Sequence, residues 1–246
     1  MTTGIWSAAS GATGRTIALD VAANNIANAS TPGFRADQTV FGEELARAGG
    51  LDAASATHRF SAVQGVETSR GPGRFEPTGR LLDVAIRDEN TFFAVSTPAG
   101  ERYTRAGNVQ LGADGTLITP NGQRYLGSNG QPIAVPPDAG EVAIQPSGDV
   151  VVGELTFGRL LTVRVDPGSA LVKEGDVLFR TVPGAARPTP VDPALEIGTL
   201  ELSNVSAIKT MSTLVNATRE FDMMTRVIDA FSAIERSAAT SVMKGR

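Results

Sequence analysis

The sequence predicts an α+β protein: two terminal helices pair as a coiled-coil or helical assembly domain, with an inserted all-β domain of short antiparallel strands. Three observations predict this arrangement. At both ends of the 246-residue chain, apolar residues recur at alternating spacings of three and four, as in a helix that packs along one seam. In the middle, short β-rich runs are separated by turn dipeptides, and nearly all of the 14 prolines lie in this zone or at its edges. We expect an N-terminal helical segment over 1–45, a linker over 46–65, the β-domain over 66–198, and over 199–246 a long C-terminal helix that pairs with the N-terminal one.

The N-terminal helix is expected from about Gly4 to Asn28, an alanine-rich stretch without proline. Its seam consists of Ile5, Ala9, Ala12, Thr16, Leu19, Ala23 and Ile26. Alanine and threonine bury little surface, and each glycine inside a helix costs about 1 kcal/mol relative to alanine. The same small residues let another helix approach closely. The pattern therefore fits either an ordinary amphipathic core helix or an assembly helix.

A turn is expected directly after this helix. Pro32 and Gly33 suit the two central positions of a type II turn, because proline presets φ and glycine accepts a positive φ. Phe34 then supplies an apolar anchor. Three nearby asparagines, Asn24, Asn25 and Asn28, exceed what a helix stop requires, and they could fix register by hydrogen bonds in a packed interface.

The middle of the chain changes to a strand-like period. Expected strands are 83–86, 92–96, 102–105, 150–152, 155–157, 160–165 and 177–179, and expected tight turns are 98–100, 114–115, 121–122 and 129–130. The stretch 46–65, with its small polar residues, is expected to be a linker. The proline-rich stretch 183–198 is expected to be the return linker to the last helix.

The C-terminal helix is expected from about Asn204 to Met243, with Ser203 or Asn204 as its N-cap. Its seam is the longer one: Ala207, Thr210, Leu214, Ala217, Phe221, Met224, Ile228, Phe231, Glu235, Ala238 and Val242. Further apolar residues widen the stripe, namely Val205, Ile208, Val215, Val227 and Ile234. A helix of about 40 residues spans roughly 60 Å. That length favours coiled-coil or bundle assembly over a lone core helix.

Composition and motifs argue against several function classes. The net charge of −4 gives no reason to expect nucleic acid, and no apolar run is long enough to span a membrane. The chain has no cysteine, and its one histidine, His58, lies in the expected linker. No phosphate loop, nucleophile elbow or dinucleotide fingerprint occurs. We therefore expect no metal, no cofactor, no enzyme activity and no membrane insertion, in a soluble chain without a secretory signal.

Several motifs occur in the order in which one known family carries them. They are ANNIANASTPGFRAD (residues 23–37), TGRLLDVAI (78–86) followed by FFAV (92–95), YTRAG (103–107), DGTL (114–117) with Asn121-Gly122, LSNV (202–205) and REFD (219–222). In this order the chain resembles bacterial flagellar rod and hook proteins, and it is most similar to the larger proximal-rod member. Residues 88–91 depart from the glycine-rich turn that is usual in the family. A distal-rod or hook-type subunit is the alternative within the family.

The resemblance implies a structural subunit of the flagellar basal-body rod, the hollow drive shaft that crosses the periplasm and transmits motor torque. It implies export through the flagellar type III apparatus without a cleaved signal peptide. The implied partners are copies of the chain itself and other rod proteins, with basal-body ring or hook proteins as further candidates. It also implies that the terminal helices form the inner tube and that the β-domain faces outward.

The candidate assembly interface follows from the two seams and the motifs beside them. It comprises Ile5, Leu19, Asn24, Asn25, Ile26, Asn28, Thr31, Pro32, Gly33, Phe34, Ser203, Asn204, Val205, Leu214, Arg219, Phe221, Met224, Ile228 and Phe231. Two other function classes compete with an assembly subunit. A stalked β-domain that binds cell-wall glycan should carry exposed aromatics, but aromatic content is only 5% and no cluster lies in the turns. An enzyme that remodels the wall should carry a metal or nucleophile constellation, which the sequence lacks.

Overall fold

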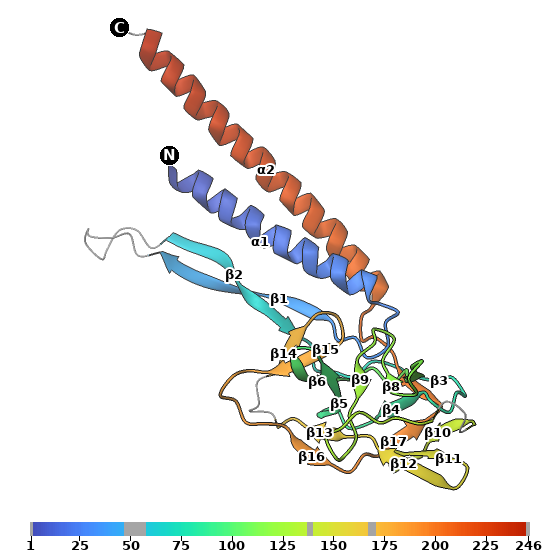
Figure 1. Cartoon of the computed structure of the whole chain (residues 1–246). Helices are drawn as coiled ribbons and strands as arrows, with labels where there is room; N and C mark the ends of the chain where they lie inside the picture. The colour runs from blue at the N-terminus through green and yellow to red at the C-terminus, as the bar shows by residue number, and fades with distance from the viewer. Residues whose placement is uncertain (1, 47–57, 137–139, 167–170, 245–246) are drawn as a thin grey trace. The chain divides into compact units, whose positions relative to one another are not determined.

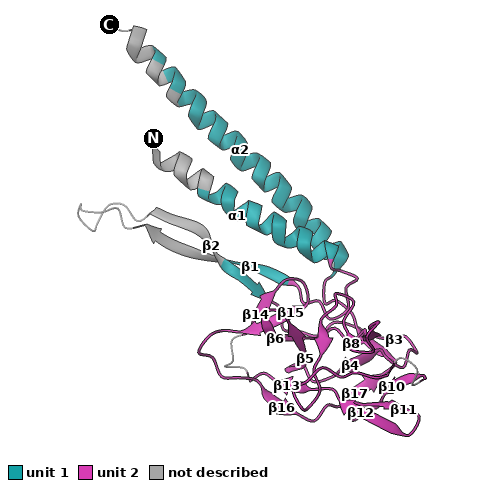
Figure 2. Ribbon diagram, in the orientation of Figure 1, with its two compact units in different colours: residues 1–27, 37–67, 206–246 teal, residues 28–36, 68–205 magenta. Residues whose placement is uncertain are grey.

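The computed structural model describes residues 2–46, 58–136, 140–166 and 171–244. The chain divides into two compact units, which Figure 2 shows in different colours. Unit 1 contains residues 1–27, 37–67 and 206–246, and unit 2 contains residues 28–36 and 68–205. The protein is thus of mixed α+β class, as predicted. Both termini belong to unit 1.

Unit 1 is built on two helices, α1 (Thr2–Ala27) and α2 (Ala207–Lys244). They pack side by side and run antiparallel (Figure 1). Arg15 of α1 forms a 2.8 Å ion pair with Glu220 of α2, and Gly11, one turn earlier, lies against the side chain of Met224, one turn later. Of the described helices, neither is both long and apolar enough to cross a membrane.

The buried face of α1 differs from the predicted seam. Ala18, Ala22 and Asn25 are buried, whereas Thr16 and Ala23 of the predicted seam are exposed. The side chains of Ile5 and Ala9 lie outside the described residues. Ala12, Leu19 and Ile26 of the predicted seam are half-buried, so the seam lies one position along the helix from the buried residues. The buried Ala18 and Ala22 are small, which permits the close approach of a neighbouring backbone.

The predicted seam of α2 coincides with its covered face. Ala217 is buried, and the other described seam positions are half-buried: Ala207, Thr210, Leu214, Phe221, Met224, Ile228 and Phe231. The side chains of Glu235, Ala238 and Val242 lie outside the described residues. The helix begins later than predicted, because the backbone N–H of Thr210 donates to the carbonyl of Ser206. Ser206 therefore precedes the first helical residue, and neither Ser203 nor Asn204 is the N-cap.

The rest of unit 1 is a two-stranded sheet of β1 (Asp37–Ala46) and β2 (His58–Thr68). The prediction of a linker over 46–65 is therefore wrong for residues 58–65, because these residues belong to strand β2. Residues 47–57 lie outside the described residues. The first part of the stretch 46–65, through Thr57, consists mostly of alanine, glycine and small polar residues. In β2, Val63 and Val66 break the alternation that Phe60 and Ala62 begin, so a search for alternating hydrophobicity misses the strand.

Unit 2 is formed by short, mostly antiparallel strands. Its strands are β3 (Phe75–Pro77), β4 (Val84–Ile86), β5 (Thr91–Thr97), β6 (Gly100–Thr104), β7 (Gln110–Leu111), β8 (Leu117–Ile118), β9 (Arg124–Tyr125), β10 (Val142–Ile144), β11 (Asp149–Val152), β12 (Leu155–Arg159), β13 (Thr162–Arg164), β14 (Leu171–Glu174), β15 (Leu178–Thr181), β16 (Thr189–Val191), β17 (Leu195–Ile197) and β18 (Thr199–Glu201). The largest sheet has the strand order β14-β15-β6-β5-β9-β8-β7, and β13 pairs with β5 and β16. The expected all-β character of the middle of the chain is thus confirmed.

The expected return linker over 183–198 contains two strands. Strand β16 lies in this stretch, and β17 pairs with β4, so that Leu195 lies opposite Ile86. The following strand, β18, pairs with β3. The prolines of residues 183–198 suggest a linker. A proline is nevertheless tolerated in a strand at a position where its nitrogen faces away from the neighbouring strand.

The predicted turns are present. Gly115, Gly122 and Gly130 all have positive φ, and each N–H donates to the carbonyl three residues earlier. These turns connect β7 with β8, connect β8 with β9, and reverse the chain after β9. The turn dipeptides therefore predicted the chain reversals correctly even where the adjoining strands are only two residues long.

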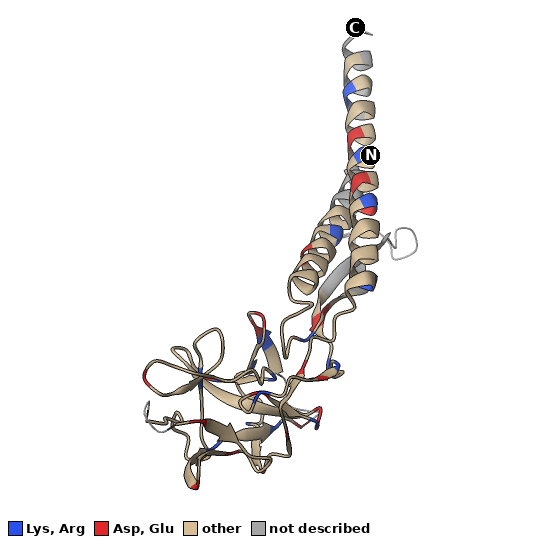
Figure 3. Ribbon diagram, turned by 90° about the vertical axis from the view of Figure 1, so that its right-hand side faces the viewer, with Lys and Arg blue, Asp and Glu red and all other residues tan. Residues whose placement is uncertain are grey.

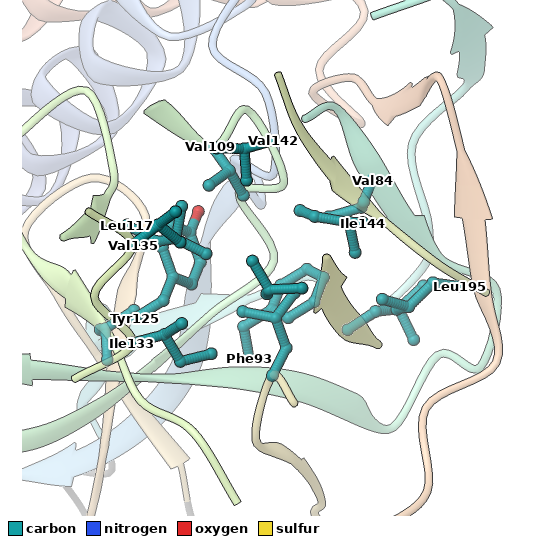
Figure 4. Close-up of a cluster of buried hydrophobic side chains, with 14 residues drawn as sticks. Val84, Phe93, Val109, Leu117, Tyr125, Ile133, Val135, Val142, Ile144 and Leu195 are labelled. Atoms are coloured by element: carbon teal, nitrogen blue, oxygen red, sulfur yellow. The ribbon is translucent and has the colours of Figure 1, made fainter. Parts of the chain in front are cut away.

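The core of unit 2 lies between these sheets (Figure 4). Phe93 and Tyr125 meet edge to face with ring centroids 5.9 Å apart, and both side chains are fully buried. Aliphatic residues surround them, namely Val84, Val95, Val109, Leu117, Ile133, Val135, Val150 and Leu160. The Tyr125 hydroxyl donates to the carbonyl of Ala106 at 2.9 Å, so its polar atom is satisfied inside the core.

The two tyrosines of the chain provide a spectroscopic test of this core. Burial raises the pKa of Tyr103 to about 12, and burial raises the pKa of Tyr125 further. In the unfolded chain both should ionise near pH 10. At pH 11 we expect only about a tenth of Tyr103 and less of Tyr125 to be ionised in the folded protein, and about nine tenths of both to be ionised in urea.

The same shifts fix the direction of the pH dependence. An acid whose pKa is raised by folding loses its contribution to stability as the pH rises above the unfolded value. The free energy of unfolding should therefore fall above pH ~10. Phenolate absorbance at pH 10 in the folded protein would contradict the buried positions of both rings.

Candidate assembly site

The predicted interface residues on the helices are divided between covered and uncovered positions. Leu214, Phe221, Met224, Ile228 and Phe231 lie on the half-buried face of α2, and Arg219 is exposed. On α1, Leu19 and Ile26 are half-buried, Asn24 is exposed, and the side chain of Ile5 lies outside the described residues. The covered residues of α2 thus make contacts within the chain. Their contact with other subunits stays a prediction.

Asn25 anchors the first strand of unit 1. Its side-chain amide donates to the carbonyl of Asp37 at 2.7 Å, and its amide oxygen accepts from the backbone N–H of Asp37 at 2.9 Å. Both polar ends of this buried side chain are satisfied by one residue. A reciprocal pair of this kind fixes where β1 begins beside the end of α1.

The turn after α1 has the predicted form. The N–H of Phe34 donates to the carbonyl of Thr31 at 3.2 Å, and Gly33 has a φ of +74°. That sign is what a type II turn requires at its third residue. The Thr31 hydroxyl also donates to the side-chain oxygen of Asn28 at 3.0 Å, which stabilises the chain before the turn.

Gly33 is required for a second reason, because it lies against the backbone of the segment after β6. A Cβ atom at this position would lie 2.3 Å from the backbone nitrogen of Ala106. Its own N–H donates to the carbonyl of Glu201 at 2.8 Å. No other residue could bring the turn this close to both segments.

Phe34 fills a small apolar cluster of its own in unit 2. Its ring is buried with Ala106 and Val177, and Val205 packs against it. The ammonium group of Lys173 lies 3.7 Å from the ring centroid and donates to the carbonyl of Arg35 at 2.7 Å. Phe34 is therefore an anchor, as predicted, but within unit 2 of its own chain.

The next residue, Arg35, belongs to a buried ionic group that we call the clasp (Arg35, Arg105 and Glu201). One carboxylate oxygen of Glu201 lies 2.7 Å from Arg35 Nη2, and the other lies 2.8 Å from Arg105 Nε. All three side chains are at most 3% exposed. The remaining donors of Arg105 reach the carbonyls of Ile86, Asp88 and Thr91.

The clasp carries two positive charges and one negative charge in a buried position. Burial lowers the pKa of Arg35 to about 10, and the nearby Arg105 lowers it as well, whereas Glu201 opposes this shift. Arg35 also donates to the carbonyl of Gly71, and the N–H of Gly73 donates to Glu201. The group is therefore held by hydrogen bonds as well as by charge, which is the condition under which a buried ion pair is tolerated.

Asn204 connects the same segments by hydrogen bonds. Its side-chain oxygen accepts from the N–H of Ala36 at 2.7 Å, and its amide nitrogen donates to the carbonyl of Gly71 at 2.8 Å and to the Ser69 hydroxyl at 3.3 Å. Ser203 is buried, and its hydroxyl accepts from the N–H of Val205. Asn204 thus joins chain segments rather than capping a helix.

These contacts hold together three segments of unit 2: residues 28–36, 69–74 and 198–205. They are the segments at which the chain passes between the two units. Such an arrangement positions backbone and offers no reacting group. Sequence reasoning identified Gly33, Phe34 and Asn204 but missed Arg105 and Glu201 in the clasp, because nothing in their spacing connects residues this far apart.

Comparison with protein-family models covers the same parts of the chain. Residues 5–35 match the model described as flagella basal body rod protein. Residues 88–152 match the flagellar hook protein FlgE/F/G D1 domain, and residues 197–241 match the flagellar basal body rod FlgEFG protein C-terminal model. The first and third matches include both sides of the junction that the clasp holds.

Comparison with curated proteins extends the likeness to most of the chain. The flagellar basal-body rod protein FlgF of Caulobacter vibrioides is 32% identical over 92% of this chain and 92% of its own length. The chain belongs to the flagellar basal-body rod protein family. FlgF of Escherichia coli is 34% identical over 85% of the chain and 86% of its own length. The rod protein FlgG of Bacillus subtilis is 32% identical over 85% and 88%.

Membership in the rod protein family confirms the resemblance drawn from the ordered motifs. This is a family of structural proteins of the flagellum basal body and not of enzymes, so the wall-remodelling alternative is excluded. In a structural rod protein, the geometry of the signature segment (residues 23–37) serves to hold the chain in place. The residues after α1 dock the chain firmly into unit 2.

The clasp can be tested by replacing its one carboxylate. Glu201→Gln leaves both buried arginines without a countercharge, and we expect the free energy of unfolding to fall by about 3–5 kcal/mol. Urea denaturation followed by circular dichroism measures this change. Glu76→Gln is the matched control, because the pair of Glu76 with Arg74 is exposed and contributes at most about 1 kcal/mol. Equal, small effects of both substitutions would show that the clasp does not stabilise unit 2.

Proposed function

We propose that the chain is a subunit of the proximal part of the flagellar rod and that it polymerises into the hollow shaft that transmits motor torque. In this proposal α1 and α2 pair as a coiled coil, and neighbouring subunits pack against that pair. The main support for the proposal is the uneven burial of α2. One of its faces is covered by α1, whereas large apolar side chains elsewhere on the helix are exposed.

The coiled-coil pairing is supported by the periodicity of the covered face. The half-buried residues of α2 alternate at spacings of three and four from Ala207 to Phe231, as the seam of a left-handed coiled coil does. The opposing face of α1 is formed by small residues, which permit a short distance between the helix axes. A closely packed pair would be stiff, as torque transmission requires.

The interface role of the predicted residues is proposed for the helices rather than for the turn. Phe34 and Gly33 are buried in unit 2, and Ser203 is buried as well, so these three position the chain. We propose contact with neighbours for the half-buried residues of α1 and α2 and for the exposed Asn24 and Arg219. We propose copies of the chain and other rod proteins as those neighbours, with ring or hook proteins and the type III export apparatus as further partners.

The proximal position is supported by the relatives named FlgF, from Caulobacter vibrioides, Escherichia coli and Salmonella typhimurium. Likeness to FlgG of Bacillus subtilis and of Agrobacterium fabrum supports the distal-rod alternative. The two assignments differ in where assembly should stop. A strain that lacks a proximal subunit should build no distal rod and no hook.

This difference defines the experiment. In a strain from which the gene is deleted, we expect isolated basal bodies to end before the distal rod and cells to be non-motile. Expression of the full chain should restore both. Basal bodies that carry a distal rod in the deletion strain would refute the proximal assignment.

The role of the helix pair is tested in the same strain by two matched variants. Ala22→Arg places a large cation on the buried face of α1, where Ala22 is 3% exposed, and we expect it to abolish rod assembly because overpacking separates the helices. Ala99→Arg makes the same change at an exposed turn of unit 2 and should restore motility. Restoration by Ala22→Arg would show that the helix pair is not needed for assembly.

A further inference from the structure

The second helix carries large apolar side chains that the described residues leave exposed. Six such residues lie on α2: Ile208, Met211, Val215, Met223, Val227 and Ile234. Ile208 is 82% exposed and Ile234 is 54% exposed. On the described part of α1 no large apolar side chain is exposed to this degree. Charged residues are sparse on α1, whereas α2 carries several of both signs (Figure 3).

These six residues form two separate patches. Patch A (Ile208, Met211 and Val215) lies in the first turns of α2, and patch B (Met223, Val227 and Ile234) lies in its second half. With a 3.6-residue turn, the α1-facing side, patch A and patch B are roughly a third of a turn apart around the helix. Groups of exposed apolar side chains on a helix normally mark a surface that another molecule covers. We therefore expect α2 to have two neighbours besides α1.

The end of patch B also extends beyond the partner helix. The ion pair of Arg15 with Glu220 and the contact of Gly11 with Met224 set the antiparallel register of α1 and α2. In that register Thr2, the first residue of α1, lies opposite about residue 233. Ile234 and the turns after it therefore have no α1 beside them, which leaves this part of α2 dependent on another molecule for cover.

We propose that patch A of one subunit packs on patch B of a second copy of this chain, with the two α2 helices parallel and displaced along their axes by about 28 Å, the helical rise between Ile208 and Val227. This inference rests on the proposed function, since it describes how subunits of the polymer meet. The two patches match in spacing. Ile208 and Val215 are one heptad apart, as are Val227 and Ile234, and all four side chains are β-branched.

The charged residues that follow patch A exclude a shorter displacement. Arg219, Asp222, Arg226 and Asp229 are exposed and continue along the same side of α2. A displacement of about 18 Å would place Val215 on Val227, but it would also press Asp222 onto Ile234. A buried carboxylate without a partner is strongly unfavourable. The longer displacement pairs both β-branched residues and places Arg219 and Asp222 beyond Ile234, opposite the small residues Ala238 and Ser241 instead of an apolar side chain.

The pairing also has the symmetry that a rod needs. Patches A and B lie on different sides of α2, so a contact between them is heterologous and leaves a free patch at each end. Contacts of this kind repeat without closing and produce a filament. Each contact buries only a few side chains, so a single pair should be weak and should persist only where many copies assemble together.

Engineered disulfides test the register directly, because the chain has no cysteine of its own. The variant Ile208→Cys with Val227→Cys is expressed as the full chain in the deletion strain, and basal bodies are isolated and oxidised. We expect dimers and higher covalent multimers on non-reducing gels. Disulfide formation requires Cα atoms within about 7 Å, so mismatched pairs should give about tenfold less product.

Two matched controls separate register from proximity. Val215→Cys with Val227→Cys uses the same sides of the helix at the wrong displacement, and Thr218→Cys with Ser237→Cys uses the correct displacement on positions turned out of the contact. Each cysteine of the matched pair is also introduced alone, and neither should cross-link to itself. All positions are exposed, so the chain should fold normally.

The outcomes are distinguishable. Absence of the cysteine-free parent chain from the basal bodies refutes the proposed function itself. Parent chain in normal rods, together with no multimers from the matched pair, refutes the proposed contact alone. Dimers from Ile208→Cys alone, stronger cross-linking of either control pair, or a covalent product with a different rod protein would each refute it too.

Discussion

One buried carboxylate, that of Glu201, holds together the parts of the chain that enter and leave unit 2. Its two oxygens bind Arg35, which follows the turn after α1, and Arg105, which follows β6. The backbone carbonyl of the same residue accepts from Gly33. The contacts of Glu201 fix the placement of Phe34 and the position of β18 beside β3. Without its carboxylate, the positive charges of Arg35 and Arg105 would be buried with no negative partner.

The clasp stabilises unit 2, whereas the helices are proposed to contact neighbouring subunits. In unit 2 the core aromatics and the clasp find their contacts within the unit. Its exposed apolar residues, Leu81, Leu111, Leu155 and Val172, come from different strands and loops, whereas those of α2 form two groups along one helix. Stability within the chain and affinity for neighbours are therefore located in separate parts. A change in one can leave the other intact, which suits a subunit that must fold before it is locked into a shaft.

The sequence predicted features that depend on residues close together along the chain. It did not predict contacts between residues that are far apart along the chain. Heptad spacing predicted the covered face of α2, and the dipeptides at Gly115, Gly122 and Gly130 predicted the turns. The predicted seam of α1 lay one position away from the buried residues Ala18, Ala22 and Asn25, because a helix rich in alanine and glycine gives only a weak periodic signal. Strand β2 was hidden in a polar stretch. The clasp could not be predicted from Arg35 alone, since its partners lie far away along the chain and ordinary charged residues carry no mark of burial.

The connection of Arg35 to Glu201 has a consequence for the order in which the protein can fold. The two residues are separated by most of the chain, and Asn204 likewise reaches back to Ala36. Contacts between such distant residues form late, because a long loop must close first. A chain that is synthesised N-terminus first therefore cannot join Arg35 to Glu201 until Glu201 itself has been made. Until then the signature segment, residues 23–37, has no anchor in unit 2.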